Sequence, residues 1–402
     1  MDTQYTPTYN RLWNREFTLL TIAELLLCIS CYMTIPLLPF RLTTEEHASS
    51  CLASFTIVTF IIGVCISGFF GSWLIQNYRR NKVFLVSAIC LGATILGLSA
   101  FEFQEQPIVR EIEEYTLLAI CFASGAVFGT AKRVLSCTLL IDKTESCNRT
   151  DANYTAIWIA RLTVIIGPIL ALLLREELRG SLFYIVGAAM SLASAVLVMC
   201  VKFPFRAPEE GVHLVSIDRF FLPRGATIAL VIALITASLG IMMTTRLTME
   251  FCTSVMVGFF LAACALHIPA IKNARFASAV GNTLAIIAIL TMFAHDDILD
   301  STIKPMLFGF GIALSSSEQL YKLLGSCDHC QRSTAESTYF LSSDGGLFLG
   351  IAAGWQLTTA VKSAEEIALG LLVVATIICS LNVLIKLSLI HISEPTRPLY
   401  IS

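Results

Sequence analysis

The chain consists largely of apolar stretches, each close to the length of a bilayer-spanning helix, which is about 20 residues. Of its 402 residues, 56% are hydrophobic and only 14% are charged. In soluble globular proteins about 25% of residues are charged. A surface with so few charged groups has to face lipid over much of its area. The composition therefore excludes a soluble enzyme, a secreted protein and a disordered chain.

We predict twelve spanning helices with short loops between them, which leaves no room for a sizeable soluble domain. The weakest boundary separates the seventh and eighth stretches, where Arg246 and Glu250 interrupt the apolar sequence. The expected fold class is an all-α polytopic membrane protein with twelve transmembrane helices. The predicted stretches cover about residues 17–40, 52–75, 83–101, 117–141, 154–174, 181–201, 226–245, 251–268, 277–294, 303–323, 335–357 and 365–386.

The positively charged residues predict the orientation. The loops on the side of the N-terminus hold sixteen Lys and Arg residues, whereas the loops on the other side hold seven. Cytoplasmic loops carry the excess of these residues, so we expect both termini in the cytoplasm. The net charge of −2 provides no electrostatic basis for a nucleic-acid partner.

The longest loop on the cytoplasmic side covers residues 202–225 and separates two groups of six predicted helices. Residues 1–201 are called the first half below, and residues 226–386 the second half. The central loop contains Pro204, Pro208 and Pro223, which argue against one continuous helix through it.

The two halves share a short internal repeat. Cys147–Thr155 aligns with Cys330–Thr338 at an offset of 183 residues, with the same residue at four of nine positions. Gly167 falls on Gly350 at the same offset. Each segment leads into the fifth predicted helix of its half. Two parallel six-helix halves, related by an axis along the membrane normal, are typical of transporters.

Two motifs resemble those of the major facilitator superfamily. The loop between the second and third helices is similar to the family's Gly-x-Leu-x-Asp-Arg-x-Gly-Arg-Lys gating motif, with Gln76 in place of its Asp. Gly167-Pro168 resembles the helix-kink motif in the fifth helix of family exporters, especially drug/proton antiporters. The residues that carry the loop motif are Ser72, Leu74, Gln76, Arg79 and Arg80.

The wider resemblance covers residues 10–386 and is to bacterial sugar-efflux and drug-efflux permeases of this family. Leu12–Phe17 resembles the start of their first helix, and Asp328–Arg332 followed by Ser337–Leu341 resembles their entry into the eleventh. This resemblance implies a major facilitator fold, in which two six-helix halves rock about a central site. It also implies the bacterial cytoplasmic membrane as the location.

Ionisable side chains within predicted membrane helices are candidates for function, because each costs about 2.5–3.5 kcal/mol at the bilayer centre. Six together would cost more than a typical protein's net stability if they faced lipid. They must therefore face water, a partner group or the interior of the bundle. The six residues are Glu24, Lys132, Arg133, Arg161, Glu318 and Asp344.

The resemblance implies that helices one, four, seven and ten line the central cavity, which makes Glu24, Lys132 and Glu318 the cavity candidates. Arg161 and Asp344 are equivalent at the offset of 183 and fall in helices at the seam between the halves. Arg133 is rotated by about 100° from Lys132, so it should pack against a neighbouring helix or lie partly in the cavity.

A carboxylate in such a site can couple its protonation to conformation. We therefore expect a secondary active transporter that exports a small molecule in exchange for protons. One alternative is an importer of a sugar or other nutrient with the same fold. Another is that the buried charges are static pairs that only fix helix packing. An alternative of a different class is a membrane sensor or a lipid-modifying enzyme.

No cofactor or metal ligand set is expected. Cys327-Asp-His-Cys330 has the spacing of half a zinc site, but no second pair lies near it in the sequence. We expect no enzymatic activity, and we expect a monomer in the bilayer. Leu387–Arg397 resembles the translation of a transposase adapter used in sequencing-library preparation. Residues 387–402 are therefore interpreted as an artefact and excluded from functional inference.

Overall fold

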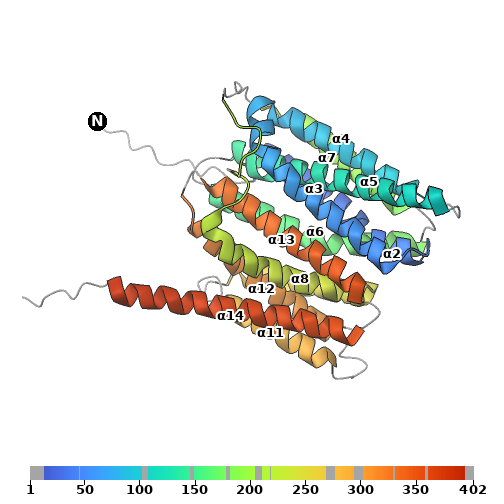
Figure 1. The fold of residues 1–402 in the computed structure, drawn as a ribbon. Helices are drawn as coiled ribbons and strands as arrows, with labels where there is room; N and C mark the ends of the chain where they lie inside the picture. Colours follow the sequence, from blue (N-terminus) through green and yellow to red (C-terminus); the bar gives the residue numbers. More distant parts are fainter. Residues whose placement is uncertain are drawn as a thin grey trace, which may run out of the picture.

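The computed structural model describes residues 13–44, 46–101, 107–144, 149–177, 182–203, 211–217, 219–268, 277–293, 302–328, 331–357 and 361–393. Within these ranges every regular element is a helix (Figure 1). The first half contains α1 (Arg15–Thr34), α2 (Leu38–Thr44), α3 (Ser50–Asn77), α4 (Arg80–Ser99), α5 (Pro107–Val134), the π-helical turn η1 (Leu135–Leu140), α6 (Arg149–Glu177) and α7 (Leu182–Met199). The central loop ends in the short turn η2 (Pro223–Gly225). It is followed by α8 (Ala226–Thr245), α9 (Met249–Ala265), α11 (Ala277–Phe293), α12 (Ile303–Gly325), α13 (Arg332–Leu357) and α14 (Val361–Ser393), which make up the second half.

Each of the twelve predicted stretches contains a helix. The described residues include eight helical segments that are both long and apolar enough to cross a membrane. The helices α9 and α11 are apolar but shorter. The helices α12 and α13 have sufficient length but are not among the eight, because they carry many of the polar residues described below. The predicted break between the seventh and eighth stretches is confirmed, since α8 ends at Thr245 and α9 begins at Met249.

Two predicted stretches differ from a single α-helix. The first divides into α1 and α2, because Pro36 and Pro39 cannot donate backbone hydrogen bonds. The fourth begins as α5 and ends in the wider turn η1. Such π turns occur as single insertions in α-helices and are frequent at functional sites.

Polar residues define several helix starts. The side chains of Asn14, Ser49 and Thr248 each accept a hydrogen bond from a backbone N–H three residues later, at 2.7, 3.2 and 3.2 Å respectively. These N-terminal caps satisfy groups that have no partner within the helix. They place the first turns of α1, α3 and α9 at the ends of their apolar runs.

The internal repeat is visible in the fold. The helix α6 begins at Arg149 and α13 begins at Arg332, the residue 183 positions later. A Cβ atom at Gly167 of α6 would lie 2.6 Å from the backbone of Tyr32 in α1. A Cβ atom at Gly350 of α13 would overlap the Ala237 carbonyl of α8. Equivalent glycines therefore allow the fifth helix of each half to approach the first helix of that half closely.

The two halves meet along α13, which lies between α3 of the first half and α8 of the second (Figure 1). Near one end of this seam the Ser54 hydroxyl donates to the Ala352 carbonyl at 2.9 Å. Further along it, the rings of Phe60 and Phe348 lie 4.9 Å apart. A second seam joins α6 of the first half to α9 and α12 of the second.

The described part of the central loop packs against the first half. The Ser216 N–H donates to the Phe69 carbonyl at 3.0 Å, and the Phe220 ring lies 5.2 Å from that of Phe69. Pro223 begins the turn η2, whereas Pro204 and Pro208 lie outside the described residues. At the other end of the chain, α14 continues through Leu387 to Ser393.

Replacing Gly68 by Leu is expected to release Phe220 from α3, because a Cβ atom at Gly68 would overlap the Phe220 ring. Full burial of a Phe side chain is worth about 1.5–3 kcal/mol, so local opening of the loop should rise by about tenfold or more. The rate of trypsin cleavage after the exposed Arg219 measures this opening. Gly71→Leu is the matched control, since open space surrounds Gly71. An equal cleavage rate in both variants would contradict the expectation.

Candidate functional site between the halves

A buried ion pair joins the two halves. Lys132 of α5 places its Nζ 2.6 Å from Oδ2 of Asp344 in α13. The Tyr32 hydroxyl of α1 donates to Oδ1 of Asp344 at 2.6 Å, and the Lys132 ammonium lies 3.1 Å from that hydroxyl oxygen. Lys132 and Asp344 are only 3% and 5% exposed. Three helices from both halves thus converge on one desolvated carboxylate.

Aromatic rings enclose this ion pair. The Lys132 ammonium lies 4.4 Å from the ring centre of Phe340 and 5.6 Å from that of Phe128. The Tyr32 ring stacks on Phe348 at 5.9 Å. Such rings attract a cation through their electron-rich faces and exclude water. The ion pair is therefore strong in this conformation, and its partners would be costly to separate without another source of charge compensation.

The predicted kink motif supports the same site. Pro168 lies inside α6, and Gly167 allows the α6 backbone to reach Tyr32. This close approach fixes the helix that carries the Tyr32 hydroxyl. The Gly-Pro pair therefore positions a side chain of the site, in addition to interrupting the hydrogen bonding of α6.

Two further buried carboxyl groups lie near the ion pair. Glu24 of α1 is fully buried and accepts a hydrogen bond from the Ser136 hydroxyl of η1 at 2.5 Å. Glu336 of α13 is also fully buried, and neither of its oxygens has a hydrogen-bond partner. The two carboxyl groups interact electrostatically with each other. Glu336 was not among the residues predicted from the sequence.

The structure places Arg133 against α3, on a different side of α5 from Lys132. Its guanidinium donates to the Val64 carbonyl and to the Ser67 hydroxyl, and it lies 5.2 Å from the Phe220 ring. This arrangement agrees with the expectation that Arg133 packs against a neighbouring helix. Arg133 thereby connects the central loop to the first half.

Arg161 crosses the second seam between the halves. From α6 it donates to the hydroxyl groups of Ser316 and Ser317 in α12, the latter at 2.9 Å. Its guanidinium also lies 4.9 Å from Trp158 and 5.8 Å from Tyr339. Among the described residues no carboxylate lies within ion-pair distance of it. Arg161 therefore does not pair with Asp344, whose partner is Lys132.

Glu318 lies apart from the cluster of Glu24, Lys132 and Asp344. It pairs with Lys322 one turn later in α12 at 2.5 Å, and it accepts the backbone N–H of Ser278 in α11. These contacts are local to the second half. They do not bring Glu318 together with the other two cavity candidates.

The residues of the loop motif connect α3 to α4. Ser72 is buried, Gln76 is half-buried and Arg79 is the exposed residue that precedes α4. Arg80 pairs at 2.8 Å with Asp142, just after η1. Since Asp142 belongs to the first half, this ion pair holds α4 to the end of η1.

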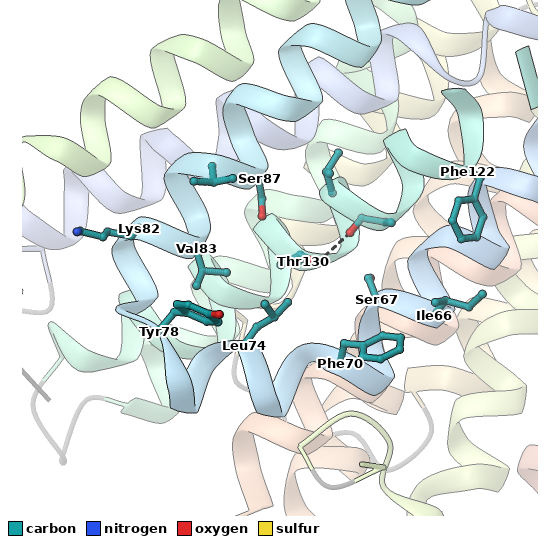
Figure 2. A pocket seen from close by; sticks show the side chains of 13 residues that line it. Ile66, Ser67, Phe70, Leu74, Tyr78, Lys82, Val83, Ser87, Phe122 and Thr130 are labelled. Carbon is teal, nitrogen blue, oxygen red and sulfur yellow. Dashed lines mark hydrogen bonds between the residues drawn. The ribbon is translucent and has the colours of Figure 1, made fainter. Parts of the chain in front are cut away.

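Leu74, the remaining residue of the motif, lines a groove between α3, α4 and α5 with a volume of about 600 Å³ (Figure 2). Apolar side chains such as Phe70, Val83 and Phe122 dominate the groove, and Lys82 lies at its edge. All of its lining residues belong to the first half, so it lies outside the inter-half site. The described residues contain no group of three or more His, Cys, Asp or Glu side chains placed to hold a metal ion.

The comparison with protein families identifies a model that covers most of the chain. Residues 20–378 match the family described as the Major Facilitator Superfamily. No curated protein matches the sequence.

Solved structures share the fold at low sequence identity. A bacterial homologue of the iron transporter ferroportin in its outward-facing state is 15% identical, with a TM-score of 0.65, and the match covers 91% of this chain and 98% of that one. The inward-facing state of such a homologue gives a TM-score of 0.63 at 14% identity, with the same coverage. A variant of the nucleoside transporter NupG is 12% identical, with a TM-score of 0.62 and coverage of 91% and 99%. The family match and these folds agree with the resemblance carried by the sequence motifs, and the chain belongs to the major facilitator superfamily.

Proposed function

We propose that this protein exports a small molecule across the bacterial cytoplasmic membrane in exchange for protons, by alternating access of its two halves. Membership of a transporter superfamily supports secondary transport in general. The observation that carries the coupling proposal is the Lys132–Asp344 ion pair, since each partner belongs to a different half.

An ion pair across the seam can link charge to conformation. While the halves are together at this point, Lys132 neutralises Asp344. When the halves separate here, the carboxylate loses its cation in a poorly solvated environment, which favours uptake of a proton. A proton on Asp344 and an ion pair with Lys132 are therefore alternatives. This exchange lets a proton gradient bias the conformational equilibrium.

The direction of transport is supported by the Gly167-Pro168 motif, which resembles that of family exporters. The mixed charge at the seam, with Lys132, Asp344 and Arg161, suits a polar or zwitterionic substrate. The related structures belong to an iron transporter homologue and a nucleoside transporter. Two such different cargoes on one fold do not indicate a substrate for this chain.

The function can be tested by transport in reconstituted vesicles. A growth screen of overexpressing cells against toxins, sugars and dyes first identifies a substrate. Wild-type protein in inverted vesicles should then take up that substrate when the lumen is acidified, and should release protons from the lumen as it does so. Uptake with no dependence on the gradient would overturn proton coupling, and accumulation only in right-side-out vesicles would indicate an importer.

Two carboxylate variants separate the candidate coupling residues. Asp344→Asn should lose proton flux coupled to substrate. Glu318→Gln should retain it, because Glu318 pairs locally with Lys322. Full coupling in both variants would contradict a role for either carboxylate.

A further inference from the structure

The ion pair leaves two buried carboxyl groups unexplained. Glu24 is fully buried on α1 of the first half, and Glu336 is fully buried on α13 of the second. Both lie close to η1, since the Cys137 thiol of that turn interacts electrostatically with each of them. Ser136 of η1 donates to Glu24 at 2.5 Å, and the backbone carbonyl of the next residue, Cys137, accepts the Ser333 hydroxyl of α13 at 3.0 Å. One end of α13 is thus held against the turn that contacts Glu24.

The two carboxyl groups have unequal surroundings. One oxygen of Glu24 accepts the Ser136 hydroxyl, and its charge also interacts favourably with that of Lys132. Neither oxygen of Glu336 has a hydrogen-bond partner. Its neighbours are the Glu24 carboxyl, with which it interacts electrostatically, and the Cys137 thiol.

The nearby cations are already engaged. Lys132 pairs with Asp344 at 2.6 Å. Arg133 donates to groups of α3, and Arg161 donates to groups of α12. The other titratable groups that interact with the two carboxyl groups are thiols, Cys28 near Glu24 and Cys137 near Glu336. Among the described residues of α4 and α7, which also pack at this end of the site, none interacts electrostatically with Glu24 or Glu336.

Two neighbouring buried carboxylates, neither of which forms an ion pair among the described residues, cannot both keep a negative charge in a dry interior, because desolvation and mutual repulsion both oppose it. The proton resides on the carboxyl group that has fewer hydrogen bonds and fewer favourable charge interactions to stabilise its ionised form. We propose that Glu336 is a proton-binding residue that holds one proton while the two halves are in contact, and that Glu24 is its ionised partner across the seam.

The role of this proton in transport rests on the proposed function, whereas the protonation of Glu336 can be tested without it. Opening the seam between η1 and α13 would bring water to Glu336 and remove Glu24 from its vicinity. The proton would then leave to water, and the ionised carboxylate would resist return to the dry contact. Glu336 would therefore provide a second proton site, separate from Asp344, that reports closure at this end of the seam.

Infrared spectroscopy of the purified protein in lipid tests the proposal without substrate or gradient. A buried carboxylic acid gives a carbonyl band that shifts in D2O. Wild-type protein at neutral pH should show this band. Glu336→Gln should lose it, whereas Glu24→Gln should keep it at a shifted position. Glu318→Gln is the matched control and should leave the band unchanged, since Glu318 forms an ion pair with Lys322 outside this cluster.

Absence of the band from wild-type protein, or its loss in Glu24→Gln alone, would overturn the assignment. Persistence of the band in Glu336→Gln would do the same. A second variant, Glu336→Met, guards against misfolding. Because the only polar neighbour of the acid besides Glu24, among the described residues, is the weakly donating Cys137 thiol, the variant with an apolar residue of similar length should unfold at an equal or higher temperature than wild type. A sharp fall in its unfolding temperature would show that Glu336 is ionised and paired. A failure of proton-coupled transport with the band intact would reject the proposed function and leave this assignment standing.

Discussion

Asp344→Asn is expected to destabilise the protein by about 3–5 kcal/mol and to abolish coupled proton movement, because it removes the carboxylate that pairs directly with the buried Lys132 ammonium. Lys132 is 3% exposed and its one described carboxylate partner lies at 2.6 Å. Thermal unfolding in detergent measures the stability, and proton flux in vesicles measures the coupling. We expect Lys132→Met to have a similar effect on coupling.

The double variant Lys132→Met with Asp344→Leu separates structure from function. Replacement of both partners by apolar residues is often neutral or stabilising, so this protein should regain stability but not proton flux. Glu114→Gln is the control, because the Arg110–Glu114 ion pair spans 3.6 Å with both side chains over one-third exposed. Such surface pairs contribute about 0–1 kcal/mol. Equal stability of Asp344→Asn and wild type would contradict a stabilising role for the Lys132–Asp344 ion pair.

Gly125→Leu is expected to prevent correct assembly of the first half. A Cβ atom at Gly125 of α5 would overlap the Phe60 carbonyl of α3, and one at Gly63 of α3 would overlap the Phe122 carbonyl of α5. Backbone cannot move aside as a flexible side chain can, so the cost should exceed the 1–3 kcal/mol or so that is typical of overpacking. The yield of monodisperse protein and its unfolding temperature measure the effect.

The matched control is Gly370→Leu in α14, since open space surrounds Gly370. The control should resemble wild type in yield and unfolding temperature. A normal yield of Gly125→Leu would mean that α3 and α5 can separate without loss of the fold. The Gly125-x-x-x-Gly129 spacing noted in many membrane dimers acts here within one chain, because Gly129 also faces α3.

The positions of the helices could be predicted because apolar length is a local property of the sequence. The breaks within them were harder to predict. The predicted first stretch, 17–40, runs through Pro36, where the structure breaks the helix, and nothing in Leu135–Leu140 marks a π turn. That turn packs against α1, α4, α6 and α13, which are distant from it in the sequence or separated from it by loops. Local pattern therefore predicts where helices lie, and packing decides their finer geometry.

The sequence predicts which ionisable residues lie within the membrane helices, but it does not predict which of them pair with each other. Lys132 and Asp344 stand 212 positions apart, and no periodicity links them. Glu336 is the second residue of the predicted eleventh stretch, 335–357, at its boundary with the preceding polar loop. The structure begins α13 at Arg332 and buries residues 334–340 of this polar region. In contrast, Glu318 has Lys322 four residues later, and this spacing alone favours the local pair.

The chemistry of Tyr32 makes separation of the halves unequal for the two charges. Tyr32 and Lys132 belong to the same half, with the ammonium 3.1 Å from the phenol oxygen. When the halves separate, the cation keeps this oxygen and the nearby Phe128 ring, whereas Asp344 loses both its ammonium and its phenol donor at once. Most of the free-energy cost of opening therefore comes from the Asp344 carboxylate, which is left without a partner for its charge. The rate of the conformational cycle should depend on how quickly water, a proton or a cationic group of the cargo reaches that single carboxylate.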